Sequence, residues 1–129
     1  MKAQVIPALF LWTFFNLYGT IYISFTNARG NLMKTLTICG SMRFAKEMMQ
    51  IAYQLEAQEG YNILQCVYCE DVPVDEELKQ LEAAHYRKID LSDGIYVVNI
   101  GGYIGESVRK EIDYAEKSGK EVIYHCGTH

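Results

Sequence analysis

The sequence has few cysteines, few prolines and few basic side chains. Four cysteines and two prolines among 129 residues exclude a disulfide scaffold and a disordered tail. The 12 Lys and Arg residues are outnumbered by 16 Asp and Glu residues, which leaves a formal net charge of -4. A general nucleic-acid binder needs clustered positive charge to neutralise phosphates, so the composition argues against that class. We expect a small molecule as the partner and no nucleic acid.

Charge is almost absent from the beginning of the chain. Residues 1–33 carry only Lys2 and Arg29, whereas the rest carries 10 basic and 16 acidic groups. No charge interrupts the 21 positions from Val5 to Phe25, and about 20 apolar residues suffice for a helix to cross a bilayer. Polar residues interrupt this apolar run. The flanking charges, Lys2 and Arg29, give little asymmetry that would set the orientation of a helix in a membrane. Residues 1–33 are therefore an apolar extension of different composition.

Three interpretations of this extension are open. Translation that begins at Met33 would lead directly into a strand and make the upstream residues a start-site artefact. Alternatively, residues 4–25 are a membrane anchor, or the extension packs as a genuine part of the protein. We favour the first interpretation, which predicts a cytoplasmic domain at 34–129. The anchor is the alternative and would place that domain at a membrane.

From Met33 onward, short apolar runs alternate with longer stretches of helical period, which is typical of βαβ units. The right-handed crossover rule then predicts a small doubly wound α/β fold, Rossmann-like or flavodoxin-like. Its parallel sheet has about four strands in the order 2-1-3-4, with helices on both faces. The predicted strands are Thr35–Cys39, Tyr61 to Val67 or Cys69, Gly94–Asn99 and Glu121–His125.

In this strand order the first and third strands are neighbours whose helices leave to opposite faces. The loops Gly40–Arg43 and Ile100–Ser107 should therefore flank one crevice, where a ligand is expected to bind. In the first loop, Gly40, Ser41 and Arg43 suit a phosphate or carboxylate. The alternative is a plain turn in which Ser41 caps the helix and Arg43 is solvated.

The second loop holds three glycines before a helix but is no dinucleotide fingerprint. In that helix Glu106, Asp113 and Glu116 each precede a lysine by four residues, so we expect solvated ion pairs there. Glu111 has no such lysine and borders the apolar stripe. It is a candidate nucleophile or stabiliser of a cationic transition state, with a solvated rim glutamate as the alternative.

His85 lies on the apolar stripe of a predicted helix. Two interpretations are open: a core histidine whose hydrogen bonds are satisfied, or a catalytic histidine. Five cysteine and histidine residues could suggest a zinc or redox site. However, Cys66 and Cys69 would point to opposite faces of a strand, so they could not bind one ion together. We therefore expect no metal there, and structural cysteines in a reducing cytosol. The five residues are Cys66, Cys69, His125, Cys126 and His129.

Three segments together resemble the nucleoside 2-deoxyribosyltransferase-like superfamily, which includes deoxynucleoside 5′-monophosphate N-glycosidase. They are Leu36–Arg43, Asp93–Val98 and Gly105–Ala115, and it is their order and spacing that carry the resemblance. The resemblance implies an enzyme that hydrolyses the N-glycosidic bond of a nucleoside or nucleotide, or transfers its deoxyribosyl group. It also implies a homodimer or larger assembly, no cofactor and no metal.

The resemblance also implies roles for individual residues. Glu111 stands at the position of the family's catalytic glutamate and would attack C1′ or support its oxocarbenium character. His85 stands where the family has an acid, and a histidine can donate a proton to the leaving base. The residues expected to hold the sugar or its phosphate are Gly40, Ser41, Arg43, Gly102, Tyr103, Gly105 and Ser107. A nucleotide-binding or sensor module of the same fold without chemistry is the alternative function.

Overall fold

The computed structural model describes residues 11–15 and 21–127, and the chain divides into two compact units, residues 1–33 and 34–129. In the first unit, strands β1 (Leu11–Phe15) and β2 (Ile21–Phe25) pair antiparallel. These described parts of the proposed anchor are strands rather than helix, and residues 4–10 and 16–20 lie outside the described residues. No described helix is both long and apolar enough to span a membrane.

The second unit is built on one parallel sheet. Its strands are β3 (Thr35–Gly40), β4 (Asn62–Leu64), β5 (Gly94–Val98) and β6 (Glu121–Tyr124). They lie in the order β4-β3-β5-β6, all parallel, which confirms the predicted order 2-1-3-4. The fold class predicted from the sequence, a small α/β fold, is therefore confirmed.

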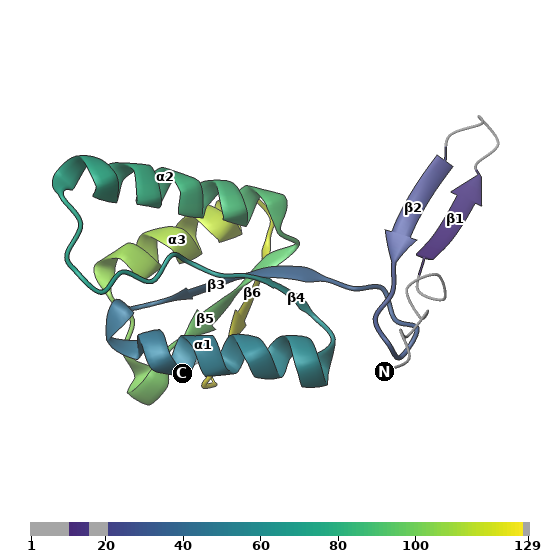
Figure 1. Ribbon diagram of the computed structural model, residues 1–129, viewed down its shortest axis with the longest axis horizontal. Coiled ribbons are helices and arrows are strands. Elements are labelled where there is room, and N and C mark those ends of the chain that lie inside the picture. The colour runs from purple at the N-terminus through teal and green to yellow at the C-terminus, as the bar shows by residue number, and fades with distance from the viewer. Residues whose placement is uncertain (1–10, 16–20, 128–129) are drawn as a thin grey trace, which may run out of the picture. The chain divides into compact units, whose positions relative to one another are not determined.

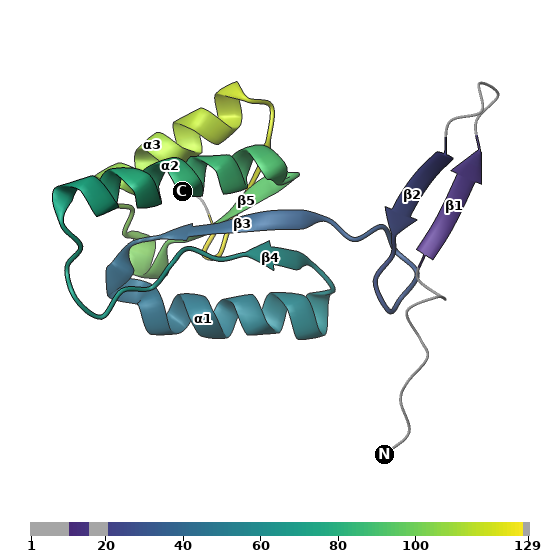
Figure 2. The ribbon, with the colours of Figure 1, turned by 45° about the horizontal axis from the view of Figure 1, so that its top comes forward.

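Helices cover both faces of this sheet (Figures 1 and 2). Helix α1 (Ala45–Gln54) lies on one face, and α2 (Asp75–Leu91) and α3 (Glu106–Lys117) lie on the other. A 3-10 turn at Met42–Phe44 leads into α1, and a π-helical turn at Leu55–Glu59 follows it. This placement leaves α2 and α3 together on the face that carries the candidate site.

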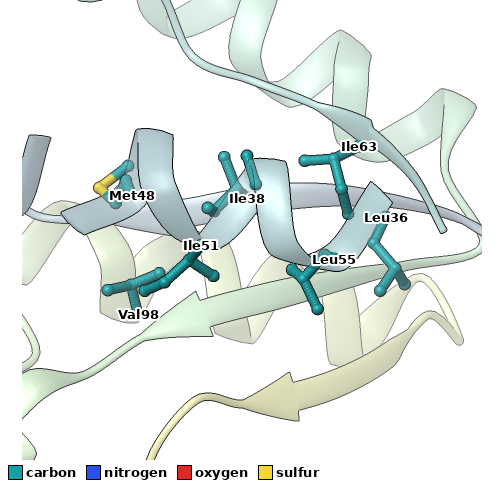
Figure 3. Close-up of a cluster of buried hydrophobic side chains, with 8 residues drawn as sticks. Leu36, Ile38, Met48, Ile51, Leu55, Ile63 and Val98 are labelled. Carbon is teal, nitrogen blue, oxygen red and sulfur yellow. The ribbon is translucent and has the colours of Figure 1, made fainter. Parts of the chain in front are cut away.

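Alternation along β3 divides the core between the two faces. Leu36 and Ile38 pack toward α1, whereas Thr37 and Cys39 point to the face under α2 and α3. Figure 3 shows the α1 side, and its buried members are Leu36, Ile38, Met48, Ile51, Ala52, Leu55, Ile63 and Val98. The other cluster consists of Cys39, Ile89, Ile95, Val97, Val108 and Ala115. One cysteine therefore stands in the core beneath α2 and α3.

Strand β4 is shorter than the sequence predicted. It pairs only with residues 35–37 of β3 and ends at Leu64, so Cys66 and Cys69 lie in the loop before α2 and not on a strand. At an edge, backbone groups beyond the paired segment need other partners. Lys88 supplies one, because its Nζ donates to the Gln65 carbonyl at 2.7 Å. The loop between β4 and α2 therefore runs past the carboxyl end of β3 before α2 begins (Figure 2).

Candidate functional site

A cavity of about 610 Å³ opens at the carboxyl end of β3, on the face covered by α2 and α3. One wall is the loop before α2, a second is the inner side of α2, and the third is the start of α3. Ligands of open α/β sheets bind outside the carboxyl ends of the strands, which is where this cavity lies. Of the residues predicted for the site, the cavity is lined by Gly40, His85, Ser107 and Glu111.

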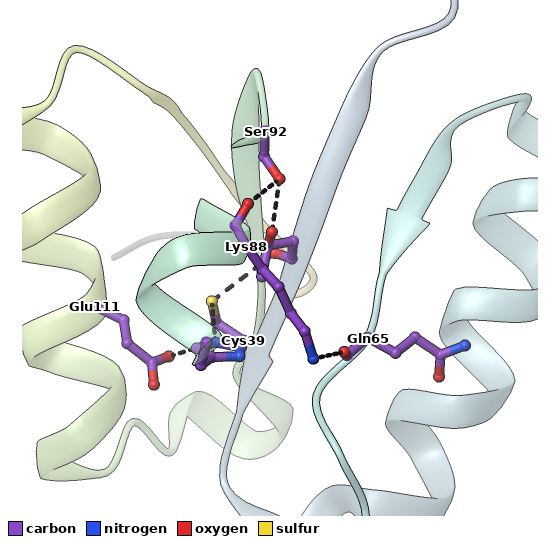
Figure 4. A network of polar contacts seen from close by, with 7 residues as sticks. Cys39, Gln65, Lys88, Ser92 and Glu111 are labelled. Carbon is purple, nitrogen blue, oxygen red and sulfur yellow. Dashed lines mark hydrogen bonds and ion pairs between the residues drawn. The ribbon is translucent and has the colours of Figure 1, made fainter. Parts of the chain in front are cut away.

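Three polar side chains meet at the cavity, one from each of three elements, and two of them line it. Cys39 comes from β3, His85 from α2 and Glu111 from α3, and Figure 4 labels Cys39 and Glu111. His85 Nε2 lies 3.4 Å from Cys39 Sγ and 3.5 Å from Glu111 Oε2. The His85 and Glu111 side chains are 13% and 15% exposed, so both are largely desolvated although they line the cavity. We call these three residues the polar cluster.

The hydrogen bonding of His85 is incomplete. Both neighbours lie at Nε2, which carries at most one proton, and the buried Nδ1 has no hydrogen-bond partner among the described residues. In a cysteine hydrolase the thiol and the acid lie at opposite ring nitrogens. Burial raises the pKa of the Cys39 thiol well above its ordinary value, and the Glu111 carboxylate raises it further. The cluster is therefore not a cysteine nucleophile with its base.

Glu111 has a partner that its own helix does not reveal. Two expected pairs on α3 are present, and they join Glu106 to Lys110 at 3.5 Å and Asp113 to Lys117 at 2.7 Å. Glu111 instead pairs with a residue of α2 across the interface between the two helices. The sequence left open whether the histidine of α2 reaches the crevice. It does, because α2 is long enough to bring its later turns over β3.

Ser41 and Arg43 do not line the cavity, although Gly40 and Met42 beside them do. The Ser41 hydroxyl caps the following 3-10 turn and accepts from the Arg43 N–H at 3.4 Å, which matches the plain-turn alternative. The Arg43 guanidinium stacks 3.7 Å from the centre of the Tyr103 ring. This contact joins the loop after β3 to the loop after β5.

The glycine-rich loop lies beside the cavity rather than in its wall. Gly102, Tyr103 and Gly105 are not among the lining residues, and Gly102 has a φ of +78° that a residue with a side chain rarely adopts. Gly105 is the N-cap of α3, so the loop positions the helix that carries Ser107 and Glu111. The opposite wall is the loop before α2, part of which the sequence predicted as strand.

The five residues considered for zinc or redox chemistry are not brought together by any contact in the described chain. Cys66 and Cys69 line the cavity, and burial raises the pKa of Cys66. His125 Nδ1 lies 2.9 Å from the Tyr96 hydroxyl, and His129 lies outside the described residues. Within residues 11–15 and 21–127, the three side chains whose spacing would suit a metal ion are instead those of the polar cluster, and their donor atoms lie within 4.8 Å of one another.

The charge of the cavity wall is strongly unbalanced. Four carboxylates line it, whereas Lys88 is the one ammonium group among the described lining residues. That ammonium already donates to the Gln65 carbonyl at 2.7 Å. The acidic residues are Glu70, Asp71, Glu82 and Glu111. A bound anion would therefore meet net repulsion, whereas a neutral or cationic group would not.

The sequence identified Glu111 and His85 but missed Cys39, Lys88 and the acidic loop. Cys39 looked like an ordinary apolar position of a buried strand, and its alternation with Ile38 was the one signal that placed it on the other face. Comparison of the chain with protein-family models, with curated proteins and with solved structures finds no match.

Proposed function

We propose that this protein cleaves the N-glycosidic bond of a nucleoside, with Glu111 as the group that acts at C1′. The observation that carries the proposal is the pairing of Glu111 with His85 in the wall of a ligand-sized cavity. A largely desolvated carboxylate is suited to covalent attack, and an adjacent imidazole is suited to proton transfer. The segments that resemble nucleoside 2-deoxyribosyltransferases carry Gly40, Ser107 and Glu111, which all line this cavity.

In the proposed reaction a Glu111 oxygen bonds to C1′ of the sugar. The C1′–N bond breaks, and its electron pair leaves with the base. A protonated His85 gives its Nε2 proton to the departing base nitrogen. Water then attacks C1′ and returns a proton to His85, and the Glu111–C1′ bond breaks, which restores the carboxylate. A second base in place of water would give transfer instead of hydrolysis.

The wall charge favours a nucleoside over a nucleotide as the substrate. A 5′-phosphate carries about two negative charges and would enter a cavity that holds four carboxylates and one engaged lysine. Arg43, the cation that the sequence suggested for the phosphate, stacks on Tyr103 and does not line the cavity. One feature would favour a phosphate: the first turn of α3, which contains Ser107, lies at the cavity. The attraction of its helix dipole for an anion is weak compared with the repulsion by four carboxylates.

The test is release of free base by the purified full chain. We would incubate it with the common 2′-deoxynucleosides, with their ribo counterparts and with the matching 5′-monophosphates, and separate the products by liquid chromatography. We expect release from at least one nucleoside, at least about tenfold faster than from its monophosphate, because the cavity repels the phosphate. Addition of a second free base distinguishes transfer, which forms a new nucleoside, from hydrolysis.

Glu111→Gln is the decisive variant, because it keeps the shape of the side chain and removes the nucleophile. We expect a loss of about a thousandfold or more in base release, with nucleoside binding retained in calorimetry. Glu116→Gln is the matched control, since Glu116 is exposed on the same helix and should keep full activity. Binding without base release by the unaltered protein would contradict the proposal and favour a binding or sensor module.

A further inference from the structure

We propose that the polar cluster, Cys39 with His85 and Glu111, binds a Zn²⁺ ion. The cluster joins one sulfur, one nitrogen and one oxygen donor, each from a different element of the fold. This inference concerns binding and stands without the proposed glycosidase activity. It rests on the spacing of the three donors, on their chemical types and on bonding that the protein alone leaves incomplete.

The donor spacing fits a tetrahedral ion. Zinc lies about 2.3 Å from sulfur and about 2.0–2.1 Å from nitrogen or oxygen, so tetrahedral donors stand about 3.3–3.6 Å apart. His85 Nε2 lies 3.4 Å from Cys39 Sγ and 3.5 Å from Glu111 Oε2. The sulfur and the carboxylate oxygen are within 4.8 Å, and zinc binding would require the Glu111 side chain to rotate where this separation exceeds about 3.6 Å. Two of the three separations therefore already have the required length.

The protein alone satisfies these groups only in part: the Cys39 thiol donates to the Thr37 carbonyl at 3.8 Å, but His85 is left with an unbonded ring nitrogen. Nε2 of His85 faces both the thiol and the carboxylate but has at most one proton to share between them. The Glu111 carboxylate favours a proton on Nε2, but no described residue bonds Nδ1, so this proton can shift to Nδ1 when a cation takes its place at Nε2. A single cation would bind Nε2, the sulfur and the carboxylate at once, and the Cys39 thiol would release its proton to solvent.

The donor set favours zinc over magnesium and calcium. Magnesium and calcium prefer oxygen ligands alone, whereas zinc accepts thiolate, imidazole and carboxylate in one site. Cys39 is buried, while His85 and Glu111 line the cavity, so the fourth position would face the cavity. Because zinc would occupy the same Glu111 oxygen and His85 nitrogen that the proposed reaction uses, it should also inhibit base release. That last consequence rests on the proposed function.

The test is a titration of the full chain with Co²⁺. This ion occupies zinc sites, and its absorption spectrum shows which kinds of ligand bind it. The protein would be stripped with a chelator, kept reduced and freed of the chelator. We expect one Co²⁺ per chain, a thiolate-to-cobalt charge-transfer band in the near ultraviolet, and loss of that band when one equivalent of Zn²⁺ is added. Base release is measured separately with chelator present. An absence of base release would contradict the proposed function and would leave the proposal of zinc binding unaffected.

Variants then identify the ligands. Cys39→Ser should remove the charge-transfer band, and Glu111→Gln should weaken Co²⁺ binding at least about tenfold. Cys126→Ser is the control, because Cys126 is not among the lining residues and its variant should keep both the band and the affinity. Circular dichroism reports folding, and Glu111→Gln keeps the test decisive if Cys39→Ser misfolds. A wild-type titration without the band, a band that survives in folded Cys39→Ser, or full affinity in Glu111→Gln would overturn the proposal.

Discussion

Gly94 allows the start of β5 to approach β6 closely. A Cβ at this position would lie 2.5 Å from the carbonyl oxygen of Glu121 and 2.9 Å from its Cβ. These atoms belong to the backbone of a paired strand or adjoin it, and they cannot move aside as the end of a flexible side chain can. We expect Gly94→Ala to lower the free energy of unfolding by about 2–3 kcal/mol, measured by urea denaturation.

Gly127→Ala is the matched control for this prediction. A Cβ at Gly127 would meet nothing within 4 Å, so the same substitution should change the free energy of unfolding by less than about 0.5 kcal/mol. Equal stability of the two variants would show that β5 and β6 can separate at this end without cost.

Single residues of the site were predictable only where their local spacing was informative. Glu111 stood out because neighbouring acids on its helix had lysines four residues away and it had none. Its pairing with His85 depends on how α2 and α3 pack on the sheet, which spacing within one helix does not show. Cys39 gave no local signal, because a cysteine in a buried strand behaves as a small apolar residue.

At the scale of elements, Lys120 stabilises the end of α2 from another part of the chain. Its Nζ donates to the Asp90 carbonyl at 3.1 Å and to the Ser92 carbonyl at 2.8 Å, where a helix leaves carbonyl groups without partners of its own. A cation there also complements the helix dipole. We expect Lys120→Met to lower the free energy of unfolding by about 1–2 kcal/mol in urea denaturation.

Lys117→Met tests whether this effect is specific to the end of α2. Lys117 pairs with Asp113 on the exposed side of α3. Exposed pairs of this kind contribute little, so no measurable change in the unfolding midpoint is expected. A loss of stability as large in Lys117→Met as in Lys120→Met would mean that surface charge in general, and not the α2 carbonyls, is responsible.

Most elements followed from patterns that the sequence displays. Apolar runs predicted β3, β5 and β6, and the stretches of helical period predicted the helices between the strands. The extent of β4 did not follow, because pairing with β3 ends at Leu64 while the apolar composition continues. Lys120 was expected to pair with Glu116, and its bonds to α2 again depend on packing.

At the scale of the whole molecule, the second unit contains its own core. Every buried residue of the two hydrophobic clusters lies between Leu36 and Ala115, inside residues 34–129. A unit of this size can bury enough apolar surface to fold without the preceding residues. We therefore expect a fragment that begins at Met33 to show helical circular dichroism and one cooperative thermal transition.

The matching control removes a segment from the other end of the chain. A fragment that stops at Lys120 lacks β6, whose pairing with β5 runs from Gly94 to Val97. That loss exposes one edge of β5 and uncovers residues of the cluster under α2 and α3, because Val122 and Tyr124 pack against it. The shortened fragment should therefore lose its cooperative transition. Loss of that transition in the fragment from Met33 as well would show that residues 1–32 are part of the folded core.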